Sequence, residues 1–251
     1  MEKVKKNLSI KRMAIVGILG AISIVLGMTP LGFIPVGPTR ATIMHIPVII
    51  GAIMEGPLVG GLIGLIFGLF SIFQAATNPT PVSFVFLNPI VSVLPRVLIG
   101  VITHYVYKFI KDLGDKRSLW ILNIIWIGAI GYLVYGAYIN IIDYKSIWPI
   151  LINAVLIILT ILIGIYVNKK LKNKAIDIIV ATIMGTLTNT VGVLFAIYIL
   201  FGEQFVEGLG QSVDMARKVI IGIGVANGIP EIIIAIIVVT NVVTGLKSRS
   251  K

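Results

Sequence analysis

Four polar side chains interrupt long apolar stretches of the sequence: Arg96, Asn189, Asn227 and Glu231. Ionisable groups are costly inside a membrane, so by default they mark a binding or transport site. A guanidinium in such a place favours a carboxylate or phosphate that it can grip with two hydrogen bonds. The chemistry that these residue types suggest is therefore recognition of a small anionic solute.

Three partners remain open for Arg96. Glu231 would form a structural ion pair with it, or a bound anionic solute would take the guanidinium instead. Both hold if Glu231 orients the guanidinium and the solute takes its free edge. In the third case the side chain extends to water along its apolar stem.

The residues before Arg96 add polar groups to the same segment. Asn88 and Ser92 precede it by eight and four residues, which predicts that all three share one face of a helix. Pro95 cannot donate a backbone hydrogen bond, so it frees the carbonyl of Val91 and bends the helix. Near the C-terminus the pattern returns, with Asn227 and Glu231 four residues apart and Pro230 just before Glu231.

Depth predicts that these groups converge. Arg96, Asn189 and Glu231 each lie 12 residues from the same predicted side of the membrane, or about 18 Å. An outward-opening cavity lined by them and by Asn227 would explain why they are tolerated. His45, at the start of a short apolar segment, would either hydrogen-bond a ligand or serve the structure. The proline-rich loops 30–41 and 77–83 would be a lid over the cavity or plain connections.

The composition determines which elements must hold these groups. Of the 251 residues 57% are hydrophobic and 12% charged, and the mean hydropathy is +1.05. Half the usual charge cannot cover a water-facing surface, so a soluble globular enzyme is excluded. We expect an all-α, polytopic membrane helix bundle with eight spans, because none of the segments alternates as a barrel strand does. The segments are roughly 13–30, 42–55, 58–76, 84–107, 119–141, 147–168, 175–201 and 219–245.

Charge predicts the orientation. Sixteen of the 21 lysines and arginines fall in four stretches, at residues 3–12, 108–117, 169–174 and 247–251. If the spans alternate, all four stretches lie on one side, which the positive-inside rule makes cytoplasmic. We therefore expect a multi-pass protein of the cell membrane with both termini cytoplasmic. The net charge of +11 then reflects topology and membrane lipid, with no nucleic-acid partner.

The chain reads as one domain, 1–251, with a possible insert. Residues 118–168 begin and end at basic cytoplasmic stretches, so they form a helical hairpin that could be removed without inverting the rest; the alternative is that they belong to the core. Gly56, Gly60, Gly64 and Gly68 give one segment a small stripe that favours internal packing. Ala14, Gly17 and Ala21 form a second small face, suited to internal packing or to docking on another membrane subunit.

Several chemistries lack their motifs. The sequence has no phosphate-binding loop of the G-x-x-x-x-G-K-[ST] type, so it cannot couple transport to ATP by itself. It has no cysteine, no hydrolase or metalloprotease motif and no paired His/Asp metal ligands. We expect neither an enzyme nor a cofactor or metal.

With these residues in view, the sequence resembles the substrate-binding S components of energy-coupling factor (ECF) vitamin transporters. The stretches that carry the resemblance are 17–21 (GILGA), 44–57 (MHIPVIIGAIMEGP), 88–96 (NPIVSVLPR), 185–189 (GTLTN) and 227–231 (NGIPE). The resemblance covers roughly 10–117 and 175–245, a six-helix core in that family, and leaves 118–168 without a counterpart. The family's A-x-x-x-A docking motif appears only as Gly17-x-x-x-Ala21.

The resemblance implies a mechanism. Such components bind a vitamin from outside under loops one and three, associate with a transmembrane coupling subunit and two ATP-binding subunits, and topple to release it inside. The run 88–96 looks most like the pantothenate-specific branch, in which Arg96 would take the carboxylate and Asn189 and Asn227 the amide and hydroxyls. Folate, pyridoxine and riboflavin branches share the architecture, and folate also carries carboxylates. A rival class is a stand-alone ion-coupled secondary transporter using Glu231.

Overall fold

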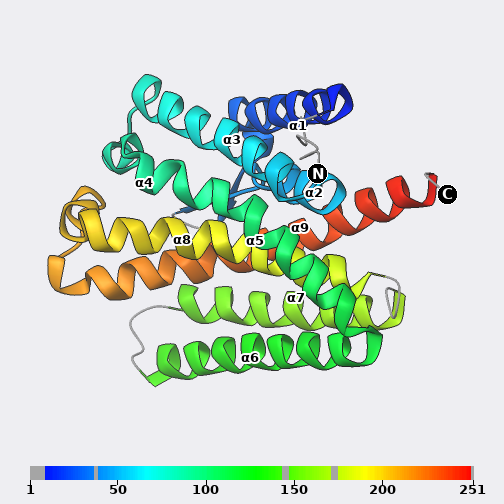
Figure 1. Ribbon diagram of the computed structural model, residues 1–251. Coiled ribbons are helices and arrows are strands. Elements are labelled where there is room, and N and C mark those ends of the chain that lie inside the picture. The colour runs from blue at the N-terminus through cyan, green and yellow to red at the C-terminus, as the bar shows by residue number, and fades with distance from the viewer. Residues whose placement is uncertain (1–8, 37–38, 143–146, 171–174, 250–251) are drawn as a thin grey trace.

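The computed structural model describes residues 9–36, 39–142, 147–170 and 175–249, and these are almost wholly helical. The bundle is shown in Figure 1. In chain order its elements are α1 (Ile10–Met28), η1 (Pro30–Gly32), β1 (Phe33–Val36), β2 (Thr39–Thr42), α2 (Ile46–Glu55), α3 (Pro57–Thr77), η2 (Ser83–Leu87), α4 (Pro89–Ser92), α5 (Leu94–Leu113), α6 (Asp115–Ile142), α7 (Trp148–Lys170), α8 (Ile176–Gly208), η3 (Val213–Met215) and α9 (Ala216–Arg249).

Six helical stretches within the described part of the chain are long and apolar enough to cross a membrane, which confirms a multi-pass membrane bundle. They are Ile10–Met28, Pro57–Thr77, Pro89–Leu113, Arg117–Ile139, Ile176–Gly208 and Val213–Arg249. Helix α2 has 10 residues, or about 15 Å of rise, so it cannot cross alone. It is buried among the other helices instead. Eight crossings remain a prediction.

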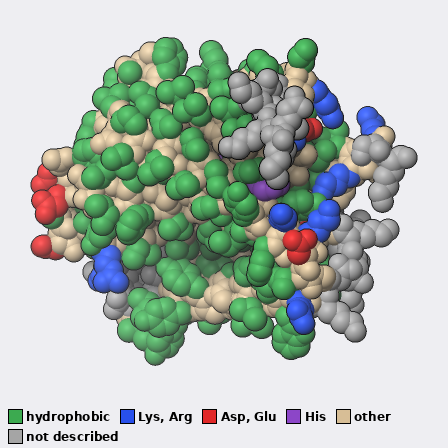
Figure 2. Space-filling view, viewed as in Figure 1, with side chains coloured by type: hydrophobic (Ala, Val, Ile, Leu, Met, Phe, Trp, Pro, Cys, Tyr) green, Lys and Arg blue, Asp and Glu red, His purple; other side chains and the backbone are tan. Residues whose placement is uncertain are grey.

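The first turn of α1 and the last turn of α9 lie at the same end of the bundle (Figure 1). On the face in view, most lysine and arginine side chains gather at that end, and most acidic side chains gather at the other (Figure 2). At the basic end, Arg12 Nε lies 3.4 Å from Glu55 Oε2, which ties α1 to the end of α2. There too, Lys247 Nζ donates to the Tyr107 hydroxyl at 2.5 Å and joins α9 to α5.

Loop 30–41, expected to be a lid or a plain connection, contains a short β-hairpin. Strands β1 and β2 pair antiparallel, with Phe33 opposite Thr42 and Val36 opposite Thr39. The Ile43 N–H donates to the Gly32 carbonyl and closes the base of the hairpin. The prediction of an all-α class therefore holds for the bundle but missed this element, because four-residue strands leave too little periodicity to detect.

The glycine stripe of α3 packs against α5, which confirms the internal-packing interpretation. A Cβ at Gly64 would lie 2.1 Å from the Arg96 carbonyl oxygen, and one at Gly68 would lie 2.7 Å from the Val93 Cα. Gly60 meets Gly100 of α5 in the same way. No side chain fits between these backbones, so the stripe sets how closely α5, and with it Arg96, approaches α3.

Helices α6 and α7 form a hairpin along one side of the bundle (Figure 1). Its side chains that reach inward include Leu122, which packs on Ile110 of α5 and Ile176 of α8. Most large apolar residues of α6 face outward, among them Ile124 and Ile127. The core cluster around Ile49, Ile63 and Ile99 contains no residue of the hairpin. This arrangement is consistent with the hairpin being an insert, and that interpretation stays a prediction.

Candidate functional site

Buried polar side chains gather where β2, the start of α2, and helices α5, α8 and α9 meet. We call the following residues the polar cluster: Thr42, His45, Arg96, Thr186, Asn189, Thr190 and Glu231. They come from segments up to 189 positions apart in the sequence. Three of the residues predicted from depth alone, Arg96, Asn189 and Glu231, thus lie buried in neighbouring helices.

Glu231 is held by two donors from different elements. Its Oε1 accepts the Thr42 backbone N–H at 2.7 Å, and its Oε2 accepts the Thr190 hydroxyl at 2.7 Å. The side chain is 3% exposed, so a carboxylate here needs such partners to offset its lost hydration. Glu231 therefore joins the β-hairpin to α8 and α9, and each of its oxygens already accepts a hydrogen bond.

Arg96 is buried at 6% exposure near the start of α5. Its Nη1 donates to the Val91 carbonyl, the one that Pro95 was predicted to free. The guanidinium carbon lies 5.4 Å from the centre of the Phe67 ring and 5.9 Å from that of Phe86, so two aromatic faces flank the cation. Its Nε is buried and has no hydrogen-bond partner in the described part of the chain.

The direct ion pair between Arg96 and Glu231 is not formed. No nitrogen of Arg96 lies within 4.0 Å of a carboxylate oxygen among the residues that the structure describes. The two charges still attract at longer range. Of the alternatives for Arg96, extension to water is also ruled out by its burial. The positive charge of the guanidinium is thus only partly balanced by Glu231, and its N–H groups can still donate to an anion.

The amides lie on α8 and α9. Asn189 is buried and its Oδ1 accepts no hydrogen bond from the described residues. Asn227 is half-buried, one turn before Glu231, and takes part in an interaction of its own. The cluster thus offers a buried donor on Arg96 and a buried acceptor on Asn189, both unpaired within the described structure. Thr42 Oγ1 and His45 Nδ1 of the same cluster are also buried without a partner among the described residues. Because buried polar atoms in native proteins are nearly always paired, these unpaired atoms make the cluster a candidate ligand site.

The predicted shared helix face is wrong for Asn88, which lies before α4 as its N-cap. Helices α4 and α5 are separated only by Val93, whose backbone is itself in the αR region, so the helical path from Ser92 to Arg96 is nearly continuous. The Asn88 side chain accepts from the Ile90 N–H at 2.8 Å, and Ser92 Oγ donates to the Phe86 carbonyl at 2.5 Å. Both side chains therefore satisfy the local backbone, and a role for them in binding stays a prediction.

His45 precedes α2 and is fully buried. Its Nε2 lies 3.1 Å from the hydroxyl of Thr186 on α8, and its ring therefore links the start of α2 to the polar face of α8. Such a contact fits the structural interpretation of His45. A ligand contact by this residue stays a prediction.

Three members of the polar cluster, Thr42, Thr186 and Thr190, were not predicted as site residues. Thr186 and Thr190 could have been found, because they lie four residues apart and share one helix face with Asn189. Thr42 could not, because it acts through its backbone N–H and only the paired hairpin brings it to Glu231.

The small face of α1 points away from the bundle. Ala14, Gly17 and Ala21 are exposed, and a Cβ added at Gly17 would meet nothing within 4 Å. Gly20 points the other way, where a Cβ would lie 2.7 Å from Ile66 of α3. Of the two interpretations of this face, internal packing within the chain is therefore wrong, and docking on another subunit remains.

Comparison with known proteins decides the family. The model of the substrate-specific component of ECF transporters matches residues 11–148 and 125–243. The chain belongs to this family. As an ECF substrate-specific component it is a membrane protein of a transport system and not of an enzyme family.

Two curated relatives of this substrate-specific component carry related names. It is 35% identical over 85 residues to the pantothenic acid transporter PanT of Lactococcus lactis subsp. cremoris, a match that covers 28% of this chain and 43% of the relative. It is 40% identical over 78 residues to the pantothenate transporter PanT of Leuconostoc mesenteroides subsp. mesenteroides, covering 31% and 38%. The chain thus matches less than half the length of either relative.

Proposed function

We propose that this ECF substrate-specific component binds pantothenate, with the vitamin's carboxylate on Arg96. The observation that carries the proposal is the buried guanidinium whose Nε has no acceptor in the described structure and which no carboxylate approaches within 4.0 Å. A buried donor left unpaired costs about 1–3 kcal/mol, which a ligand carboxylate would recover. The names of the two curated relatives support the choice of vitamin.

The rest of the vitamin matches the polar cluster in kind. Pantothenate carries two hydroxyls and an amide N–H, which are donors for the unpaired Oδ1 of Asn189. Asn227 adds an amide on α9, within one turn of Glu231. Phe67 and Phe86 flank the guanidinium and leave its edge as the polar part that a carboxylate would meet. Folate would place the same carboxylate chemistry on Arg96 but must also fit a pterin ring.

Transport would depend on partners. We place the basic end of the bundle in the cytoplasm, with both termini, by the positive-inside rule. The exposed face of Ala14, Gly17 and Ala21 would dock the transmembrane coupling subunit, because small residues let two helices approach closely in lipid. Two ATP-binding subunits would supply the energy. A stand-alone ion-coupled mechanism through Glu231 is less favoured, since both of its oxygens already accept hydrogen bonds.

Calorimetry of the purified chain with pantothenate, folate, pyridoxine and riboflavin tests the substrate. We expect tight one-to-one binding of pantothenate alone. Arg96→Ala should weaken it about 30-fold or more, the effect of removing one partner of a buried charge pair. Pantothenol, which has a CH2OH in place of the carboxylate, should bind wild type and Arg96→Ala with similar affinity.

The matched control is Arg117→Ala, which removes an exposed arginine from α6 and should leave affinity unchanged. Tight binding of another vitamin would keep the family and overturn the substrate. Equal binding of pantothenate and pantothenol by the wild-type protein would refute the carboxylate contact with Arg96.

A further inference from the structure

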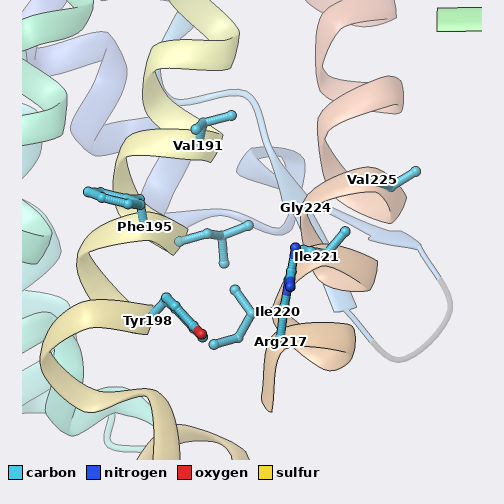
Figure 3. Close-up of a pocket in the computed structure, with 9 residues that line it drawn as sticks. Val191, Phe195, Tyr198, Arg217, Ile220, Ile221, Gly224 and Val225 are labelled. Carbon is cyan, nitrogen blue, oxygen red and sulfur yellow. The ribbon is translucent and has the colours of Figure 1, made fainter. Parts of the chain in front are cut away.

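A groove of about 530 Å³ lies between α8 and α9, and no residue of the polar cluster lines it. Figure 3 shows its lining, and the residues are Val191, Leu194, Phe195, Tyr198, Arg217, Ile220, Ile221, Gly224 and Val225. Val191 is 58% exposed and Phe195 is 64% exposed, so the groove lies on the outer surface of helices that span the membrane. We therefore expect the groove to face lipid.

The groove is polar at one end only. Arg217 is the second residue of α9, and Tyr198 lies opposite it on α8 (Figure 3). The guanidinium runs along the groove from the start of α9 toward Ile221 (Figure 3). From Arg217 the groove continues to Val225, eight residues or about 12 Å deeper, between apolar side chains only.

Arg217 has no ion pair or hydrogen bond within the described residues, although Asp214 precedes it by three positions. A cation that lies at the mouth of an apolar groove and is left unpaired by its acidic neighbour matches a molecule with an anionic head and a long apolar tail. We infer that the groove binds a phospholipid, with its phosphate on Arg217 and one acyl chain between α8 and α9.

The lining also argues against a helix of a partner protein as the occupant. Helices pack closely in membranes through small residues on both sides. This groove is walled by Leu194, Phe195 and Tyr198 and has a single glycine, Gly224. The small residues suited to a partner helix lie on α1 instead. The lipid inference rests on the membrane location and does not depend on the vitamin.

Native mass spectrometry of the detergent-purified chain, titrated with dioleoyl phosphatidylglycerol and with dioleoylglycerol, tests the inference. We expect one saturable phosphatidylglycerol per chain and weaker binding of the diacylglycerol, which lacks the phosphate. Arg217→Gln should weaken phosphatidylglycerol binding about tenfold, the effect of losing a charge-assisted hydrogen bond, and leave diacylglycerol unchanged. Ile221→Trp should fill the groove and weaken both.

The matched control is Lys218→Gln, which removes the same charge from the next position, outside the groove lining. It should leave both affinities unchanged. Equal losses in Arg217→Gln and Lys218→Gln would indicate general surface charge and overturn the site. The inference also fails if Ile221→Trp leaves the affinity for both lipids unchanged. It fails as well if Arg217→Gln abolishes assembly with a partner subunit but does not change the affinity for phosphatidylglycerol. Thermal unfolding of each variant in detergent shows whether it is folded, independently of both the lipid and the vitamin results.

Discussion

Replacing Glu231 tests whether it holds the β-hairpin to the bundle. Glu231→Ala removes the acceptor of the Thr42 N–H and the Thr190 hydroxyl, both at 2.7 Å. Each hydrogen bond to a buried carboxylate contributes about 1.5–3 kcal/mol, so losing both should lower the free energy of unfolding by about 3–6 kcal/mol. The substitution also leaves Arg96 without its nearby opposite charge, which adds to the cost.

Glu231→Gln separates these contributions. The amide oxygen can still accept from Thr42, and the hydroxyl of Thr190 can turn to accept from the amide nitrogen. We therefore expect a smaller loss, about 1–2 kcal/mol, mainly from the missing charge. Thr190→Val should lower the free energy of unfolding by about the contribution of one hydrogen bond. In the Glu231→Ala background the same substitution should lower it by less, because the two side chains share that bond.

Thermal unfolding in detergent gives the measurement. A loss of about 3–6 kcal/mol corresponds to a drop in Tm of roughly 6–24 °C for a chain of this size. Hydrogen exchange at the Thr42 amide gives a local readout: protected in wild type, and fast in Glu231→Ala. Glu203→Ala, at an exposed position of α8, is the control and should change neither. An unchanged Tm with a still protected Thr42 amide in Glu231→Ala would refute the reasoning.

Three further predictions concern how the bundle is built. Gly64→Ala places a methyl group 2.1 Å from the Arg96 carbonyl oxygen. It should therefore lower the free energy of unfolding by about 1–3 kcal/mol and weaken pantothenate binding. Gly61→Ala is the control, because its Cβ would lie 3.8 Å from its nearest neighbour, and it should change neither stability nor binding. Gly17→Leu should leave Tm and vitamin binding unchanged and abolish co-purification with the coupling subunit; retained co-purification would place docking elsewhere. Deleting 119–168 with a short joining loop should leave pantothenate calorimetry unchanged, and loss of folding would assign that hairpin to the core.

The contacts among distant segments were the hardest to foresee. Burial of Arg96 and Glu231 followed from their depth in apolar segments, and the carbonyl freed by Pro95 did bind Arg96. Sequence could not show that Glu231 takes its donors from Thr42 and Thr190, because those contacts depend on how the hairpin and α8 pack on α9. The most obvious pairing of opposite charges, Arg96 with Glu231, was for the same reason not the one formed.

Local geometry also limited the prediction for Asn88 and Ser92. A helix that included Asn88 would have aligned it with Arg96, but the helical stretch begins at Pro89 and Asn88 only caps it. The side chains of Asn88 and Ser92 instead form hydrogen bonds with backbone groups of Ile90 and Phe86. Spacing assigns a shared face only within a helix, and Pro89 occupies the first helical position, so Asn88 lies outside it.

The sequence by itself determined the membrane bundle, the basic stretches and the presence of buried polar groups, because hydropathy, charge and helical spacing are local properties of the chain. For the two patterns of small residues the sequence decided only one case. It assigned the glycine stripe of α3 to internal packing, but for the small face of α1 it left both internal packing and docking possible. Tertiary structure decided that Gly17 points away from the bundle, that Arg96 retains an unpaired donor, and that Arg217 lies in a groove between α8 and α9. These depend on which helices pack together and at what rotation, a choice set by side-chain fit across the whole core.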